Sequence, residues 1–163
     1  MVYAAWILFL AMMTLIFNNL LEKQNNPNRN LISSQNPDGS YEVSLIRNRY
    51  GHYVTSGQIN RQAVTFLIDT GATQISIPAP VADRLGLVRG APFQVMTANG
   101  QVTVYSARLD RVSIGPLEIA DLQAGINPQL DGDEILLGMN FLKHLDMIQR
   151  GDRLILKMPG LSM

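Results

Sequence analysis

The sequence predicts a small, closed all-β barrel with one or two short helices, preceded by an N-terminal transmembrane helix. From Tyr41 onward, short apolar strands alternate with frequent turn signals, which is typical of a closed β architecture. Residues 1–21 form an uncharged, largely apolar run, which is long enough to be a membrane helix. The stretch between them is rich in Asn, Gln, Ser and Pro, which is typical of a linker.

Composition limits the kinds of function that remain. The 163 residues include 13 Lys and Arg and 13 Asp and Glu, so no net charge attracts nucleic acid. The chain has no cysteine, which excludes disulfides and thiolate chemistry. Its two histidines are far apart in sequence and leave little material for a zinc site or a His-based triad. No metal or cofactor is therefore expected.

The N-terminal run is expected to be an uncleaved anchor. About 21 helical residues span about 30 Å, which matches the hydrocarbon core of a bilayer. A cleaved signal peptide is the alternative, but no Lys or Arg precedes the run and no small-x-small site follows it, as such a peptide requires. Lys23 and Arg29 follow the run, which by the positive-inside rule favours a cytoplasmic domain.

Four segments are expected along the chain. They are a transmembrane anchor (1–21), a flexible linker (22–40), a β domain (41–158) and a C-terminal tail (159–163). The linker has only Leu31 and Ile32 as an apolar pair, too little apolar surface to offset the entropy cost of ordering it.

Within the domain, the alternation of apolar and polar residues and the turn residues between them predict the elements in order. An Asn-Gly pair between two strands is a strong hairpin signal, and Pro80 and Gly86 suit the start and end of a helix. The expected strands are 41–47, 53–59, 63–69, 75–77, 93–97, 101–109, 111–114, 117–126, 135–137, 145–149 and 153–157, with short helices at 80–85 and 140–145.

The stretch Phe66-Leu67-Ile68-Asp69-Thr70-Gly71-Ala72-Thr73 carries the main functional signal. It is an apolar strand that delivers a carboxylate to a turn, and Gly71 permits a close backbone approach beyond it. A carboxylate at the end of a buried strand is costly unless it is held or used. Alone, the Asp-Thr-Gly tripeptide favours a structural role in which Asp69 caps the turn through backbone amides, because such a tripeptide can arise by chance.

The order of three elements favours a catalytic role. After the carboxylate turn comes a hairpin around Asn99-Gly100, and then a second buried strand followed by glycine and a short helix, Leu136-Leu137-Gly138-Met139-Asn140-Phe141-Leu142. With Gly51-His52-Tyr53-Val54 before the first hairpin, the chain from about residue 50 to 157 resembles the retropepsin-like aspartic proteases. The resemblance is to their bacterial, single-domain, membrane-anchored branch.

The resemblance implies a role for each of these segments. Asp69 would be the catalytic carboxylate, with Thr70, Gly71 and Ala72 forming the active-site loop. Leu137 and Gly138 would belong to the scaffold of the site. The hairpin around Asn99-Gly100 would be the flap that closes over a bound peptide, with Thr97, Ala98, Asn99 and Gly100 contacting substrate. The branch also implies the bacterial inner membrane with a periplasmic domain, in disagreement with the charge argument from Lys23 and Arg29.

The chain supplies only one such carboxylate, because no second Asp-Thr-Gly or Asp-Ser-Gly is present. A twofold-symmetric homodimer would bring Asp69 of each copy together, and two adjacent carboxylates share one proton. The expected function is thus a membrane-anchored aspartic endopeptidase that acts on peptides near the bilayer. The alternative is a non-catalytic peptide-binding or scaffolding barrel in which Asp69 is structural.

Overall fold

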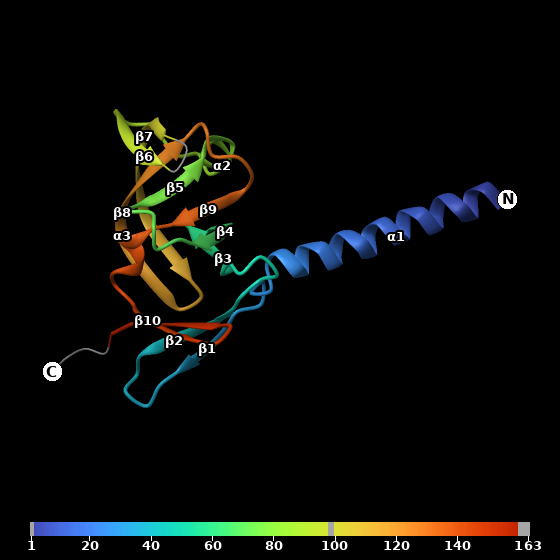
Figure 1. Ribbon diagram of the computed structural model, residues 1–163, viewed down its shortest axis with the longest axis horizontal. Coiled ribbons are helices and arrows are strands. Elements are labelled where there is room, and N and C mark those ends of the chain that lie inside the picture. The colour runs from blue at the N-terminus through green and yellow to red at the C-terminus, as the bar shows by residue number, and fades with distance from the viewer. Residues whose placement is uncertain (1, 98–99, 160–163) are drawn as a thin grey trace.

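A computed structural model describes residues 2–97 and 100–159 of the chain. A long helix, α1 (Val2–Asn25), projects from a body built of two β-sheets (Figure 1). Helix α1 continues four residues beyond the expected end at Leu21. Its span Ala5–Asn25 is long and apolar enough to cross a membrane, and none of it is buried against the body.

The larger sheet closes on itself. Its strands lie in the order β3-β4-β9-β5-β8-β7-β6, and β3 also pairs with β7, so that β6 is left outside the ring as the partner of β7. The predicted all-β barrel is confirmed as this closed ring of strands. The strands are β3 (Val54–Ile59), β4 (Gln62–Ile68), β5 (Ile75–Pro78), β6 (Pro92–Thr97), β7 (Gly100–Ile114), β8 (Leu117–Asn127) and β9 (Glu134–Leu137).

The smaller sheet lies beside the ring and shares its core. Its strands are β1 (Ile32–Gln35), β2 (Tyr41–Ile46), β10 (Asp146–Arg150) and β11 (Arg153–Lys157), in the order β1-β2-β11-β10. Val43 and Leu45 alternate with less buried residues along β2, and Leu154 and Leu156 do the same along β11. This period of two turns one face of the sheet toward the common hydrophobic core, to which all four residues belong.

Two short helices complete the core. Helix α2 (Ala79–Arg84) begins with a proline in its first turn and buries Val81 and Ala82. Helix α3 (Met139–Leu142) buries Phe141 and Leu142. Both helices lie close to the expected positions, and their ends differ by a few residues because the terminal turns lack distinctive capping side chains.

Local turn chemistry fixes two of the strand connections. Asn60 and Arg61 both have positive φ, 48° and 67°, as the two-residue hairpin between β3 and β4 requires. Between β1 and β2, hydrogen bonds from the backbone N and Oγ of Ser40 lower the pKa of Asp38 to about 2. The charged form of Asp38 therefore stabilises this turn above its ordinary pKa of 3.8, and that contribution is lost as the pH falls toward 2.

One expectation about the strands was wrong. The strands expected at 101–109 and 111–114 are one continuous strand, β7, since Asp110 does not interrupt it. Its partner β8 contains Asp121, which has a φ of 55°, and the two strands keep one register on both sides of this residue.

The flexible coil expected over 22–40 is structured instead. The end of α1 occupies its start, β1 pairs with β2, and Asn28 is only 4% exposed. Asn28 Nδ2 donates to the carbonyl oxygens of Ile46 (2.9 Å) and Val54 (2.7 Å), and its Oδ1 accepts from Ile46 N (2.7 Å). The segment has few apolar contacts, and the side-chain amide of Asn28 holds it instead through hydrogen bonds to the backbone of β2 and β3. The tail at 159–163 lies outside the described residues, apart from Pro159.

Replacing Asn28 by Ala is expected to lower the free energy of unfolding by about 3 kcal/mol, because buried backbone groups of Ile46 and Val54 lose their partner. Asn30→Ala is the matched control, since Asn30 is exposed in the same segment and its loss should change stability by less than about 0.5 kcal/mol. Urea unfolding of the full chain in detergent micelles measures both. Equal stability of the two variants would mean that Asn28 does not hold the segment.

Candidate active site

Asp69 lies where two parallel strands end side by side. Strands β4 and β9 are parallel, with Ile68 opposite Leu137, so the residues that follow them, Asp69 and Gly138, are neighbours. Asp69 N donates to Leu137 O at 3.2 Å and extends the ladder by one step. Two segments that are far apart in sequence are thereby brought together at one edge of the ring.

The carboxylate of Asp69 is held by its own turn and is still accessible. Its Oδ1 accepts from Gly71 N at 2.9 Å, and its backbone O accepts from Ala72 N at 3.3 Å. Asp69 and Ala72 are half-buried, whereas Thr70 and Gly71 are exposed. Across residues 2–97 and 100–159, no Lys or Arg forms an ion pair with Asp69. The second oxygen is therefore available to a reactant or to a second chain.

The segment after β9 forms hydrogen bonds to the loop that follows Asp69, which we call the carboxylate loop. Met139 N donates to Ala72 O (2.8 Å), and Asn140 N donates to Thr73 O (3.0 Å). A Cβ on Gly138 would lie 2.5 Å from Gln74 O and 2.7 Å from Ala72 O. Only glycine permits this approach, because the atoms that would clash belong to the backbone and cannot rotate away. Gly138 is therefore required for the close approach of β9 to the loop after Asp69, and its role in an active site stays a prediction.

Asn140 joins two strands next to the candidate site, and sequence reasoning did not predict these contacts. Its Oδ1 accepts from Ile75 N (3.0 Å), and its Nδ2 donates to Gln123 O (2.7 Å). The amide thus joins the start of β5 to β8, just beyond the carboxylate loop. The signal available in the sequence was a single Asn following Gly-Met at a helix start, and this does not reveal which distant backbone groups it contacts.

A partly open apolar surface lies next to the carboxylate. Strand alternation places Leu67 on the same face as Asp69, and Leu67 lies opposite Leu136 of β9. Leu136 lies in turn opposite Ser76. All three side chains are half-buried, whereas Phe66 and Leu137 on the other face are fully buried.

The expected flap is the β6–β7 hairpin, which extends beyond the ring (Figure 1). Thr97 Oγ1 donates to Gly100 O at 2.8 Å and closes its end, while Ala98 and Asn99 lie outside the described residues. Along β6, Phe93 and Val95 are half-buried and Met96 is 81% exposed. At its base, Phe93 is close enough to contact a Cβ placed on Gly125.

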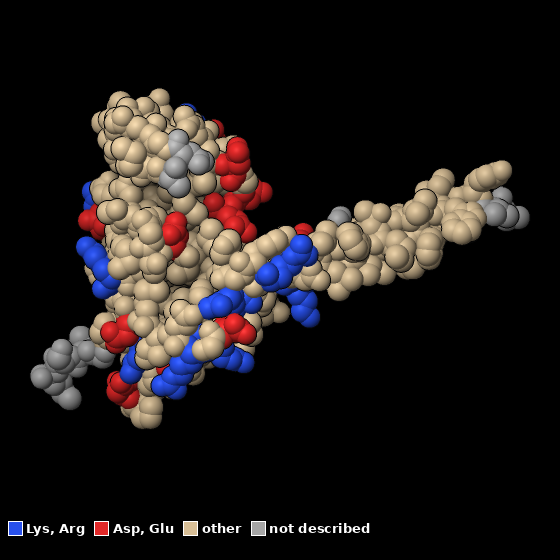
Figure 2. Space-filling view, in the orientation of Figure 1, with Lys and Arg blue, Asp and Glu red and all other residues tan. Residues whose placement is uncertain are grey.

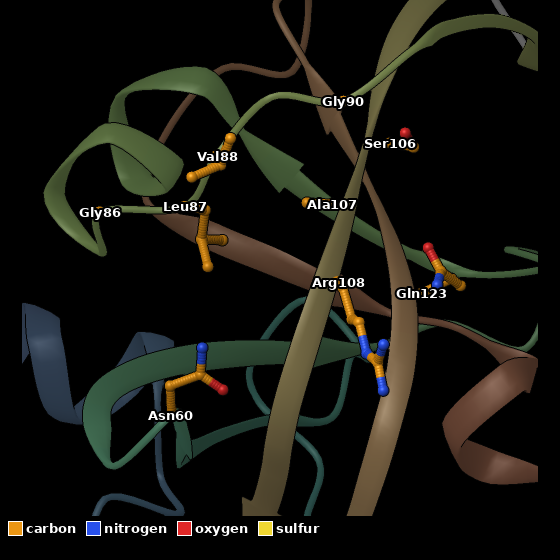
Figure 3. A pocket seen from close by; sticks show the side chains of 9 residues that line it. All are labelled: Asn60, Gly86, Leu87, Val88, Gly90, Ser106, Ala107, Arg108 and Gln123. Carbon is orange, nitrogen blue, oxygen red and sulfur yellow. The ribbon is translucent and has the colours of Figure 1, made fainter.

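A separate open depression of about 410 Å³ lies on another part of the barrel (Figure 3). Leu87 and Val88 come from the segment after α2, and Ser106, Arg108 and Gln123 come from β7 and β8. None of the expected active-site residues lines it. Within the described residues, no three His, Asp or Glu side chains gather as a metal site would require.

Comparison with known proteins agrees with this geometry. Residues 55–144, just over half of the chain, match the model of the family described as gag-polyprotein putative aspartyl protease. The chain belongs to this family of retropepsin-like aspartic proteases, and the resemblance inferred from the sequence is confirmed. The match spans the expected active-site loop, the flap and the Gly138 segment.

The chain is also similar to individual proteins and solved structures. The chain is 35% identical over 124 residues to an uncharacterized protein in the cobV 5′ region of a Sinorhizobium species, covering 74% of this chain and 53% of that protein. The chain therefore spans about half the length of that curated relative. It is 26% identical to a retropepsin-like aspartic protease from Rickettsia conorii, with a TM-score of 0.59, covering 78% of this chain and 94% of that one. A structure of the EIAV protease with an inhibitor matches at 22% identity and a TM-score of 0.45, over 59% and 89% of the two chains.

Asn140→Asp is expected to lower the free energy of unfolding by about 1–2 kcal/mol at neutral pH, because a carboxylate has no proton to donate to Gln123 O. Relative to wild type at the same pH, part of this loss should return below about pH 4, where protonation restores a donor. Thermal unfolding at both pH values measures the effect. Asn140→Ala is the control, since it should show no such recovery, and recovery in neither variant or in both would exclude this role of the amide.

Proposed function

We propose that the protein is an aspartic endopeptidase that is active as a homodimer. The carrying observation is the accessible carboxylate of Asp69, which is held by Gly71 N at the joint end of β4 and β9. It occurs in a chain that belongs to the retropepsin-like family. Thr70 would brace the loop across the dimer, and Gly71 and Ala72 would present backbone to the substrate.

The dimer supplies the second carboxylate that the chain lacks. Twofold symmetry sets Asp69 against Asp69 of the partner subunit, as an isologous interface does. Two unit charges about 4 Å apart cost about 4 kcal/mol at an effective dielectric of about 20. The pair therefore shares one proton rather than ionising twice. The open face at Leu67, Leu136 and Asp69 supports this assembly, because a second copy would convert it into an enclosed cleft.

The shared proton defines the reaction. The ionised carboxylate removes a proton from water as the water oxygen attacks the scissile carbonyl carbon, and the protonated carboxyl donates a hydrogen bond to the carbonyl oxygen. Collapse of the tetrahedral intermediate breaks the C–N bond, and the amine leaves with a proton from the dyad. The hairpin with Thr97, Ala98, Asn99 and Gly100 would cover the bound peptide. Leu67 and Leu136 favour apolar side chains beside the cleaved bond.

Helix α1 is proposed as the membrane anchor, with residues 1–21 in the bilayer and 41–158 as the protease domain. The length and exposed apolar surface of α1 support this assignment. An inner-membrane location with a periplasmic domain is proposed on the family resemblance. The substrate would then be a peptide or protein near the membrane surface.

Asp69→Asn tests the chemistry. Loss of the ionisable group should reduce peptide cleavage by about 10³-fold or more, whereas the amide oxygen can still accept from Gly71 N and preserve the fold. The matched control is Asp110→Asn, which removes an exposed carboxylate from β7 and should cleave like wild type. Peptide cleavage by both variants is followed by mass spectrometry, with circular dichroism to confirm folding. Unchanged cleavage by Asp69→Asn would leave the non-catalytic peptide-binding role as the better description.

Mixing experiments test the shared site. When half of the chains carry Asp69→Asn at constant total concentration, activity should fall to about a quarter, because random pairing leaves about one dimer in four with two carboxylates. Chains that act alone would retain about half. The two chains are mixed in detergent, allowed to exchange and assayed on one peptide. A linear dependence of activity on the wild-type fraction would contradict the dimeric site.

A further inference from the structure

The C-terminal end of α1 is fastened to the body by polar contacts. Gln24 Oε1 accepts from Arg49 Nη1 at 2.9 Å, and Asn25 O accepts from Asn48 Nδ2 at 3.0 Å. One residue further, Asn26 Nδ2 donates to Ser56 Oγ at 3.3 Å. The loop that follows β2 is thus held against the last turn of α1, and its position along the helix is fixed.

That position corresponds to the headgroup region of a bilayer. The apolar residues of α1 run to Leu21, and Glu22 follows. If the apolar run occupies the hydrocarbon core, the next turn of helix, about 5.4 Å long, lies among the headgroups. Gln24 belongs to this turn, so its partner Arg49 lies at the same depth.

Basic side chains gather at this junction, which we name the basic collar. In Figure 2, Lys and Arg side chains concentrate where α1 meets the body and over the sheet below it. The β10–β11 turn joins the same region, because Arg47 N donates to Asp152 O at 2.9 Å and Arg153 lies opposite Ile46. The basic collar consists of Lys23, Arg29, Arg47, Arg49, Arg150 and Arg153.

Most basic side chains of the collar form no ion pair with an acidic side chain of the described residues. Only Arg29 and Arg47 form ion pairs there, with Glu22 and Asp152. Along the described chain, the other four collar residues have no carboxylate partner within 4.0 Å. Most arginines of the barrel differ from them, since Arg84, Arg89, Arg108 and Arg111 each pair with an acidic side chain. Among the described residues, Arg61 in the β3–β4 turn is the barrel arginine without an ion pair.

An aromatic side chain completes the collar. Tyr50 is 60% exposed, and the guanidinium carbon of Arg49 lies 4.6 Å from the centroid of its ring. Tyrosine is enriched at membrane–water interfaces, where its ring contacts lipid and its hydroxyl contacts water. An exposed Arg–Tyr pair beside an apolar helix therefore matches a lipid surface better than bulk water.

We infer that the basic collar binds anionic phospholipid headgroups and thereby holds the protease domain against the membrane surface. This inference rests on the membrane anchoring proposed above. Clusters of four to eight basic residues on the cytoplasmic side of a membrane helix bind anionic lipid, with about a fivefold gain per residue at the surface. The same attraction acts within a Debye length of any leaflet that carries anionic headgroups, so it applies to a periplasmic domain as well. The chain is neutral overall, so the attraction is local to the face that adjoins α1.

The test uses the full chain in vesicles of phosphatidylcholine alone or with phosphatidylglycerol. Because the chain has no cysteine, His52→Cys provides a single dye position on an exposed side chain in the loop 48–52. Acrylamide quenching of the dye reports docking of the loop. Trp6, the only tryptophan, lies in α1, and its quenching by brominated lipids reports insertion independently.

Phosphatidylglycerol should protect the dye, and Arg49→Gln with Arg150→Gln should lower the ratio of docked to undocked domain by about 20-fold. The control pair is Arg84→Gln with Arg89→Gln, which changes net charge equally on the barrel and should leave docking unchanged. Salt at about 1 M, where the Debye length is about 3 Å, should abolish the protection.

Three outcomes would overturn the inference. Equal dye quenching in both vesicle types, with Trp6 in contact with lipid, would reject the collar and retain the anchor. An equal effect of the two variant pairs would show attraction by net charge alone. Trp6 accessible to water in both vesicle types would reject the anchor and the collar together, while leaving the proposed peptidase activity untouched.

Discussion

The parallel pairing of β4 with β9 is the constraint on which the rest of the candidate site depends. It places Asp69 beside Gly138, although 68 residues lie between them in sequence. The approach is possible only because Gly138 has no Cβ to meet the carbonyl oxygens of Gln74 and Ala72. Once the strands are paired, the backbone amides after Gly138 are satisfied by the carboxylate loop. The same contacts that bury the end of β9 therefore fix the direction of Asp69.

Sequence reasoning succeeded where structure is set locally. The alternation in β2, the turn between the strands expected at 53–59 and 63–69, and the glycine-ended strand before α3 each follow from short-range rules, and the structure contains all three. The positive φ of Asn60 and Arg61 was not predicted, since neither residue is glycine. The order of the motifs also identified the family. The sequence did not predict which polar side chains would form hydrogen bonds to backbone groups of distant strands. Asn140 contacts β5 and β8, and no rule of spacing tells which backbone groups an isolated amide will satisfy.

Asn28 shows why the linker was misjudged. Composition measures how much apolar surface a segment can bury, and the segment 22–40 has little. Folding also requires that buried backbone groups find partners. The ends of β2 and β3 leave Ile46 N, Ile46 O and Val54 O for an outside partner, and one asparagine supplies all three bonds. A polar segment is thus ordered because it supplies hydrogen-bond partners to backbone groups of the neighbouring strands, although it buries little apolar surface itself.

In the proposed membrane-anchored dimer, the ordered contacts between α1 and the body would have a different effect on association from that of a flexible linker. A flexible tether raises the local concentration of a second copy but leaves each domain free to turn. The contacts of Gln24, Asn25 and Asn28 instead tie the body to the end of α1, so rotational freedom is already reduced before two domains meet. In the proposed dimer, less entropy would be lost on association, and a weak interface would suffice. In that proposed dimer, these ordered contacts would restrict pairing to copies whose Asp69 faces can meet while both helices share one bilayer. In the proposed anchored dimer, the orientation of the chain in the membrane and the assembly of the active site would be coupled through the residues between α1 and β2.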